Sequence, residues 1–201
     1  MVFIAAVILC FCSCGGGGGD NNHPPPSFPT TGTIELHNYS DVAIDGFYLA
    51  PVDQTLWGPN ILKDLLYPDE YVLVLDIDRG YYDTKITATG LYSDYFGYLY
   101  DIPVDAGQNI VLDLDNSSFT GSLELRNDTL ANIIGIYVVP ADDPTWGVNQ
   151  TPSAIGPSGV LHLSDLEPGL YDVMIVWDLG PDSIYYDISV ESLTLRTLNV
   201  D

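Results

Sequence analysis

The chain of 201 residues has few basic side chains: five Lys and Arg residues stand against 28 Asp and Glu residues, for a formal net charge of −23. Nucleic-acid binding depends on cations that displace counterions from phosphates, and adsorption to an anionic lipid surface needs a basic patch. The sequence therefore excludes nucleic acid as a partner and excludes membrane contact through a basic surface.

Cysteine is absent beyond residue 14, and the three cysteines that the chain has are Cys10, Cys12 and Cys14. The rest of the chain therefore has no disulfide, no thiolate metal site and no cysteine nucleophile. Extensive disorder is excluded as well, because 46% of the residues are hydrophobic and they recur along the whole length.

A long hydrophobic run is also missing. The apolar residues before Ser13 are fewer than the roughly 20 that a membrane-spanning helix needs, and they match the apolar part of a secretory signal. This stretch resembles a bacterial lipoprotein signal, with the small Ser13 directly before Cys14. The resemblance implies a signal peptide at 1–13, lipidation at Cys14 and a membrane partner reached through the lipid, at the outer membrane or cell surface. The alternatives are a cleaved or uncleaved signal without lipidation and a cytoplasmic protein.

Residues 14–31 continue with five glycines and four prolines, the composition of a flexible and then extended tether. Two copies of one sequence follow. The 29 residues from Gly32 match the 29 from Gly121 at 12 positions without a gap, at an offset of 89. We therefore predict two homologous domains, called here the first repeat (32–120) and the second repeat (121–201).

Short segments rich in Val, Ile, Tyr and Thr alternate with turn residues in both repeats, which is typical of an all-β sandwich. Strands are predicted at 33–37, 43–50, 71–75, 81–89, 98–102 and 109–114, and at 122–126, 133–139, 159–163, 170–176, 185–190 and 193–200. A single helical turn is predicted at 61–66. Asn38-x-Ser40 and Asn127-x-Thr129 suit side-chain-to-backbone turns after the first strand of each repeat.

The segment LSDLEPGLYDVMIV, which begins at Leu163, resembles the tyrosine corner of fibronectin type III and immunoglobulin-like Greek-key sandwiches. In such corners the tyrosine hydroxyl bonds to the backbone a few residues upstream. This resemblance assigns the role to Tyr171, and to Tyr82 in the first repeat. The predicted fold class is two tandem Greek-key sandwiches of this kind.

Each repeat also resembles a small all-β domain of exported bacterial proteins with no established activity. The shared pattern is Asn-x-Ser/Thr, Tyr-Val-x-Pro, Trp-Gly-x-Asn and Tyr-Asp. It falls on Asn38, Ser40, Tyr48, Pro51, Trp57, Gly58, Asn60, Tyr82 and Asp83, and on Asn127, Thr129, Tyr137, Pro140, Trp146, Gly147, Asn149, Tyr171 and Asp172. Ala50 and Val139 replace the usual serine before proline. The resemblance implies location and architecture, and no mechanism.

Aromatic residues supply the candidate binding surface. Six tyrosines lie between Tyr81 and Tyr100, and this stretch is where the repeats differ most. Tyrosine offers contact area at low entropic cost, so a ligand or partner surface is predicted at Tyr92, Tyr95, Tyr98 and Tyr100, with cross-strand packing as the alternative. Trp57 and Trp146 are predicted to fold over the sandwich as buried covers, with an exposed sugar- or peptide-stacking role as the alternative.

Catalysis and metal binding find little support in the residues. His37 and His162 occupy unrelated repeat positions, and no nucleophile elbow, phosphate loop or His/Cys/Glu metal set is present. The acidic pairs lack calcium-loop spacing and are predicted to be solvated turns. No catalytic residue, metal or cofactor is therefore predicted. The predicted function is a lipid-anchored, non-enzymatic binding or structural module, and the alternative is a Ca²⁺-dependent or carbohydrate-binding adhesin-like module with a protein or glycan partner.

Overall fold

The structure is a computed structural model that describes residues 29–90 and 94–201. These residues form β-strands and one short 3-10 turn at Asn116–Ser118, so the predicted all-β class is confirmed. The strands are β1 Thr31–Asn38, β2 Ile44–Pro51, β3 Tyr71–Asp78, β4 Gly80–Thr89, β5 Asp94–Val104, β6 Asn109–Leu114, β7 Gly121–Asn127, β8 Ile133–Pro140, β9 Val160–Leu166, β10 Gly169–Trp177, β11 Ser183–Val190 and β12 Leu195–Val200. In the described ranges no helix has the length and apolarity to span a membrane.

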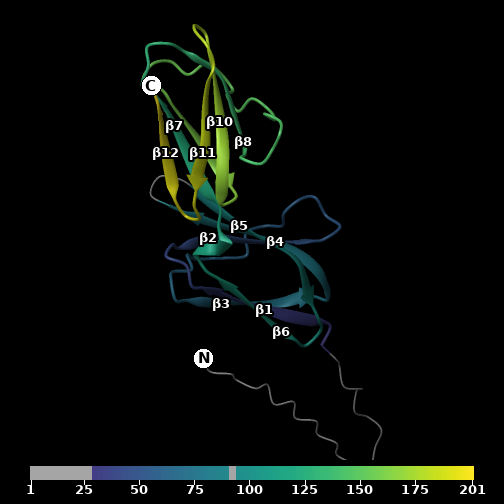
Figure 1. Cartoon of the computed structure of the whole chain (residues 1–201). Coiled ribbons are helices and arrows are strands. Elements are labelled where there is room, and N and C mark those ends of the chain that lie inside the picture. The colour runs from purple at the N-terminus through teal and green to yellow at the C-terminus, as the bar shows by residue number, and fades with distance from the viewer. Residues whose placement is uncertain (1–28, 91–93) are drawn as a thin grey trace, which may run out of the picture.

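Each repeat is a sandwich of two three-stranded sheets (Figure 1). The first repeat has sheets of order β3-β1-β6 and β2-β4-β5, and the second has sheets of order β9-β7-β12 and β8-β10-β11. The chain changes sheet after β1, β2, β3 and β5, as in Greek-key sandwiches. One feature was not predicted: the first and last strands of each repeat pair in parallel, β1 with β6 and β7 with β12.

The strands form where buried and exposed residues alternate. In β1, Ile34 and Leu36 are fully buried, while the alternate residues Thr33, Glu35 and His37 face outward. Equivalent positions build the core of the second repeat, where Leu123 and Leu125 are buried in the same way. The first core is larger because it also includes Phe47, Phe119 and Tyr95; the second consists of Leu123, Leu125, Ile133, Ile136, Val173, Ile175 and Val200.

A buried asparagine closes the turn after the first strand of each repeat, as predicted. Asn38 is 0% exposed; its side-chain nitrogen donates to Val42 O at 2.8 Å and Leu66 O at 2.9 Å, and its oxygen accepts from the Ser40 N–H at 3.0 Å. Asn127 repeats this arrangement with Ala131, Ile155 and Thr129. Both side chains are thus fully hydrogen-bonded in an apolar core, which fixes the turn.

The predicted tyrosine corners are confirmed in both repeats. Tyr82 donates its hydroxyl to Asp78 O at 3.0 Å, and Tyr171 donates to Glu167 O at 2.8 Å. Burial raises the pKa of both hydroxyls, and the negative charge of Asp78 or Glu167 adds to the effect. The corners therefore keep their protons, and with them the donated bonds, at neutral pH.

The predicted helical turn at 61–66 is wrong. This segment is an extended loop that is bonded to β2: the Ile61 N–H donates to Phe47 O at 2.9 Å, and Leu66 forms a reciprocal backbone pair with Ile44. Ile61 and Leu66 pack onto the core in this extended form. The apolar spacing was thus misinterpreted, because tertiary pairing with β2 overrides a short helical period.

The two sandwiches meet at the sheet that contains β5, with the second repeat standing above it in Figure 1. The Thr120 N–H donates to Phe96 O at 2.7 Å, and the Leu193 N–H donates to Thr120 O at 3.1 Å. Phe119, in the connection between the repeats, is buried in the first core. The connection is therefore hydrogen-bonded to both repeats.

Candidate functional site

Three aromatic side chains gather on the outer face of the sheet β2-β4-β5. The rings of Tyr98 and Tyr100 are stacked, with centroids 6.4 Å apart and planes 9° from parallel, and Trp57 lies 6.2 Å from Tyr98. Tyr100 is 64% exposed and Trp57 38% exposed. We call Trp57, Tyr98 and Tyr100 the aromatic ledge.

A β-bulge positions the tyrosines of the ledge. The register between β4 and β5 shifts next to Asp101, which adopts a left-handed conformation with φ 56°. The Asp83 carboxylate accepts the Asp101 N–H at 3.0 Å and holds this conformation. Bulges redirect neighbouring side chains. Asp83, the aspartate of the Tyr-Asp motif, therefore helps to set the direction of the Tyr100 side chain.

Turn chemistry positions the tryptophan. The Gly58 N–H donates to Leu49 O at 3.1 Å, and a Cβ on Gly58 would lie 2.7 Å from the same oxygen, which only glycine avoids. Asn60 accepts the Phe47 N–H at 3.0 Å and donates to Asp45 O at 2.8 Å. Gly58 and Asn60 thus hold the loop against β2, and Trp57 extends from the loop over the sheet face.

Tyr98 also connects the ledge to the second repeat. Its hydroxyl donates to the Asp165 carboxylate at 2.9 Å. The pKa of Tyr98 is raised far above the ordinary tyrosine value, first by burial and then by the hydrogen bond to Asp165. Beside it, the Lys85 ammonium lies 4.7 Å from the Phe96 ring centroid. Sequence reasoning missed both Asp165 and Lys85, because neither carries a local motif.

The structure agrees with only part of the predicted ligand or partner surface. Tyr98 and Tyr100 belong to the ledge, but the assignment of Tyr95 is wrong: its side chain is 6% exposed and part of the first core. Side chains alternate between the two faces of β5, and Tyr95 lies three positions before the outward-facing Tyr98, so it faces the core. Tyr92 lies outside the described residues. Trp57 was predicted as a buried cover and is instead substantially exposed, whereas Trp146 is half-buried.

The second repeat lacks this stacked arrangement among its described residues. Ile184 takes the place of Tyr98 opposite Met174, which takes the place of Lys85. Tyr186 corresponds to Tyr100 and is 63% exposed. Without a second tyrosine beside it, Tyr186 stands as a single exposed ring, so the ledge distinguishes the first repeat.

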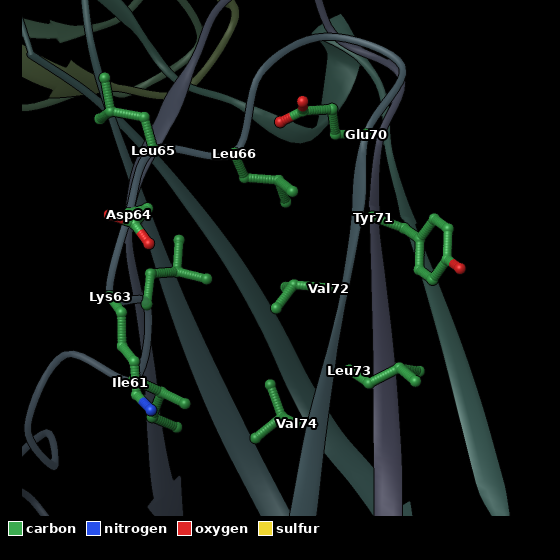
Figure 2. Close-up of a pocket in the computed structure, with 11 residues that line it drawn as sticks. Ile61, Lys63, Asp64, Leu65, Leu66, Glu70, Tyr71, Val72, Leu73 and Val74 are labelled. Carbon is green, nitrogen blue, oxygen red and sulfur yellow. The ribbon is translucent and has the colours of Figure 1, made fainter.

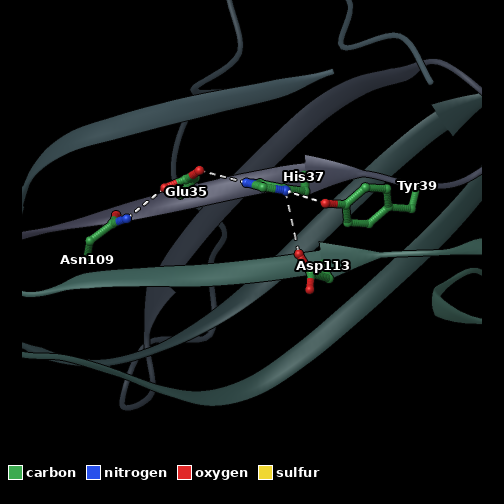
Figure 3. A network of polar contacts seen from close by, with 5 residues as sticks. All are labelled: Glu35, His37, Tyr39, Asn109 and Asp113. Carbon is green, nitrogen blue, oxygen red and sulfur yellow. Dashed lines mark hydrogen bonds and ion pairs between the residues drawn. The ribbon is translucent and has the colours of Figure 1, made fainter. Parts of the chain in front are cut away.

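His37 belongs to a network on the other sheet of the first repeat (Figure 3). Its Nε2 lies 2.7 Å from Glu35 Oε1 and its Nδ1 lies 2.8 Å from the Tyr39 hydroxyl, while Asn109 donates to Glu35 Oε2 at 2.7 Å. Asp113 is 3.7 Å from Nδ1. The hydrogen bond with His37, followed by that from Asn109, lowers the pKa of Glu35. The imidazole is thus held by its neighbours on a sheet face.

Several acidic residues have structural tasks. Asp76 and Asp165 occupy equivalent left-handed positions beside bulges, as do Asp101 and Asp187. Asp115 caps the 3-10 turn, where the Ser117 hydroxyl and N–H lower its pKa. Over residues 29–90 and 94–201, no group of three or more His, Cys, Asp and Glu side chains is close enough to hold a metal ion.

The predicted signal peptide at 1–13, the lipidation of Cys14 and most of the tether at 14–31 lie outside the described residues. No protein-family model matches the chain, and no curated protein matches it significantly.

Three solved structures from Gram-positive bacteria are similar at a low level. The Bacillus anthracis TIE protein has 14% identity and a TM-score of 0.30 over 86% of this chain, which spans about a third (34%) of that protein's chain. A minor pilin of Streptococcus agalactiae has 14% identity and a TM-score of 0.32 over 85% of this chain and 94% of its own. The shaft pilin SpaA of Lactobacillus rhamnosus GG has 11% identity and a TM-score of 0.26 over 83% and 97%. TM-scores this low assign no function to the chain.

Proposed function

We propose that the protein is an exported bacterial lipoprotein, anchored to a membrane through Cys14, whose two repeats act as a non-enzymatic binding module. The observation that carries this proposal is the aromatic ledge. Its three rings lie on the outer face of the sheet β2-β4-β5, beside the junction with the second repeat, and Trp57 and Tyr100 remain accessible to solvent. Accessible aromatic rings of this kind suit contact with a macromolecular partner.

The ledge has the properties of a contact surface. Tyr and Trp offer large areas with few rotatable bonds, which makes their ordering inexpensive on binding. The stacking of Tyr98 on Tyr100 and the hydrogen bond from Tyr98 to Asp165 orient the rings before a partner arrives. Preorganisation of this kind improves affinity because less freedom is lost on binding.

The remaining features agree with a tethered module at the cell envelope. The Ser13-Cys14 junction and the glycine- and proline-rich tether resemble those of lipoproteins, and the motif residues shared with small exported bacterial domains are those that shape turns in this structure. The acidity is spread evenly, with net charges of −12 in the first repeat (15 acidic, three basic) and −10 in the second (12 acidic, two basic). Such a charge favours solubility and solvation.

A carbohydrate-binding adhesin-like role is the second candidate. The half-exposed Trp57 beside stacked tyrosines favours it, because sugar rings pack against aromatic faces. Thermal melting of the protein with added glycans and with added Ca²⁺ distinguishes the two candidate functions. A binding module for protein partners predicts no change in melting temperature, whereas the adhesin-like module predicts a clear increase.

The proposed surface is tested by photo-crosslinking in the intact bacterial host. A photoreactive amino acid at position 100 is expected to give a discrete adduct that Trp57→Ala weakens, and the same group at position 186 serves as the matched control. Equal adducts at both positions, or none at position 100, would contradict the assignment of the ledge. The anchor is tested separately: Cys14→Ser is expected to move the protein from the membrane to the soluble fraction.

A further inference from the structure

The strand β3 is an edge of its sheet, and its exposed edge is unusually apolar. The sheet order β3-β1-β6 leaves one side of β3 without a strand neighbour. Its first five residues, Tyr-Val-Leu-Val-Leu at 71–75, carry no charge, and Tyr71, Leu73 and Leu75 are 61%, 49% and 61% exposed. Proteins commonly protect such edges with charges or proline, because an open apolar edge pairs with other strands.

The backbone of this edge is directed outward. The Asn38 N–H donates to Glu70 O at 2.9 Å, and the ladder pairs Leu36 with Val72. Because successive residues of a strand direct their backbone groups to opposite sides, Tyr71 and Leu73 turn their N–H and C=O groups away from β1. These groups are available to an added strand.

A groove of about 400 Å³ runs beside this edge (Figure 2). One wall is β3, and the other is the loop 61–66, which is bonded to β2 and not to β3 in the hydrogen bonds of the described residues. Leu66, Val72 and Val74 line its apolar floor, and the charges on its rim are those of Lys63, Asp64 and Glu70.

We propose that β3 binds an extended cationic segment of a partner protein by β-strand addition. Main-chain hydrogen bonds to Tyr71 and Leu73 would provide affinity, and alternate side chains would enter the groove. The charges specify the partner: the apolar stretch is flanked by Glu70 and Asp76, so basic residues at the two ends of the added strand are matched, with five residues between them.

Self-association is the competing occupant, and the charges disfavour it. Antiparallel pairing of two β3 strands about Leu73 would bring Glu70 of each copy close to Asp76 of the other, and each chain carries a net charge of −23. Like charges directly opposite one another in a sheet destabilise the pair.

The second repeat supplies a matched control. Its strand β9 is the equivalent edge, where His162 replaces Leu73 and Ser164 replaces Leu75. Polar residues protect the edge of β9 from pairing with another strand, so we do not expect an extended cationic segment to bind there.

The experiment titrates the whole protein with the blocked peptide Lys-Thr-Val-Thr-Val-Thr-Lys. Binding is expected to slow amide hydrogen exchange at Leu73 and not at His162. Leu73→Pro removes the outward N–H and leaves the ladder to β1 intact, so it is expected to weaken binding at least tenfold, whereas His162→Pro has no effect. N-methylation of alternate peptide amides tests the same hydrogen bonds without altering the protein and is expected to weaken binding equally.

Three results would overturn the proposal. They are the absence of saturable binding, binding that the N-methylated peptide retains, and equal binding of a peptide with Glu at both ends. Sedimentation shows whether the protein alone forms a dimer that Leu73→Pro dissolves; such a dimer would replace the cationic partner with a second copy. None of these outcomes bears on the aromatic ledge, which lies on the other sheet.

Discussion

The two repeats share one internal framework and differ on their outer faces. The buried asparagines, the tyrosine corners and the bulge aspartates recur at equivalent positions with equivalent hydrogen bonds. On the outside, Tyr98 is replaced by Ile184 and Leu73 by His162. Side chains that hydrogen-bond to buried backbone atoms are the same in the two repeats, because losing such a bond lowers the stability of the fold. Exposed positions carry no such bond and differ between the repeats.

The largest effect is expected where the framework is shared. Asn38→Ala removes the side-chain hydrogen bonds to the Val42 and Leu66 carbonyls and leaves the buried Ser40 N–H without an acceptor. It should lower the free energy of unfolding by about 3 kcal/mol. Asn127→Ala should do the same in the second repeat. Denaturant unfolding measures both, and a loss confined to one repeat would show that the framework is not equivalent.

The tyrosine corners are expected to have an intermediate effect. Tyr82→Phe and Tyr171→Phe each remove one hydroxyl-to-carbonyl hydrogen bond and keep the ring. Each should therefore lower the free energy of unfolding by about 1 kcal/mol. Thermal melting of the two variants checks the equivalence of the corners. If both variants melt like the original protein, the corner bonds do not contribute to stability.

A smaller effect is expected at the junction. Tyr98→Phe removes the hydrogen bond to Asp165. Because this contact is exposed, its loss should lower the free energy of unfolding by about 0.5 to 1 kcal/mol. Because this bond joins the repeats, calorimetry should show their transitions moving apart. Tyr100→Phe retains the stacked ring and serves as the control; an identical shift in that variant would argue against a linking role for the Tyr98 hydroxyl.

The smallest effect is a pH dependence at Glu35. Its pKa is lowered by His37 and Asn109, so the folded protein binds this proton more weakly than the unfolded chain does. Glu35 therefore stabilises the fold above the ordinary glutamate pKa, and this contribution disappears as the pH falls through the lowered value. The stability difference between the original protein and Glu35→Gln should shrink on acidification.

Glu124→Gln is the matched control variant at neutral pH. Glu124 lies 3.6 Å from His162 and 3.9 Å from Arg126, which are looser contacts than the 2.7 Å contact of Glu35. Its substitution should therefore lower the free energy of unfolding by less than Glu35→Gln does. A larger loss in Glu124→Gln would reverse the comparison between the two sheet faces.

Much of the fold could be predicted because its signals are local. Segments rich in Val, Ile, Tyr and Thr between turn residues located the strands, and the Asn-x-Ser/Thr turns and the tyrosine corners depend on contacts within a few residues. The parallel pairing of β1 with β6 was not predictable in this way, because it joins residues more than 70 positions apart. The prediction at 61–66 failed for the same reason: its partner is β2.

The candidate site was predicted only in part. Tyr98 and Tyr100 were identified from the tyrosine-rich stretch, whereas Tyr95 was included although its side chain faces the core. Six tyrosines in one stretch hide the phase of the strand, and a bulge shifts that phase again at Asp101. Asp165 and Trp57 reach the ledge from distant segments, and composition alone does not show which face they cover.

The sequence by itself determined the duplication, the all-β class, the turn-forming asparagines and the acidity shared by both repeats, since each follows from local pattern or composition. Only the tertiary structure decided which side chains face outward. It brings Trp57 beside Tyr98, leaves β3 as an edge strand without a neighbour on one side, and joins the repeats through the hydrogen bond between Tyr98 and Asp165. These features depend on strand order and on the position of bulges, which long-range packing selects.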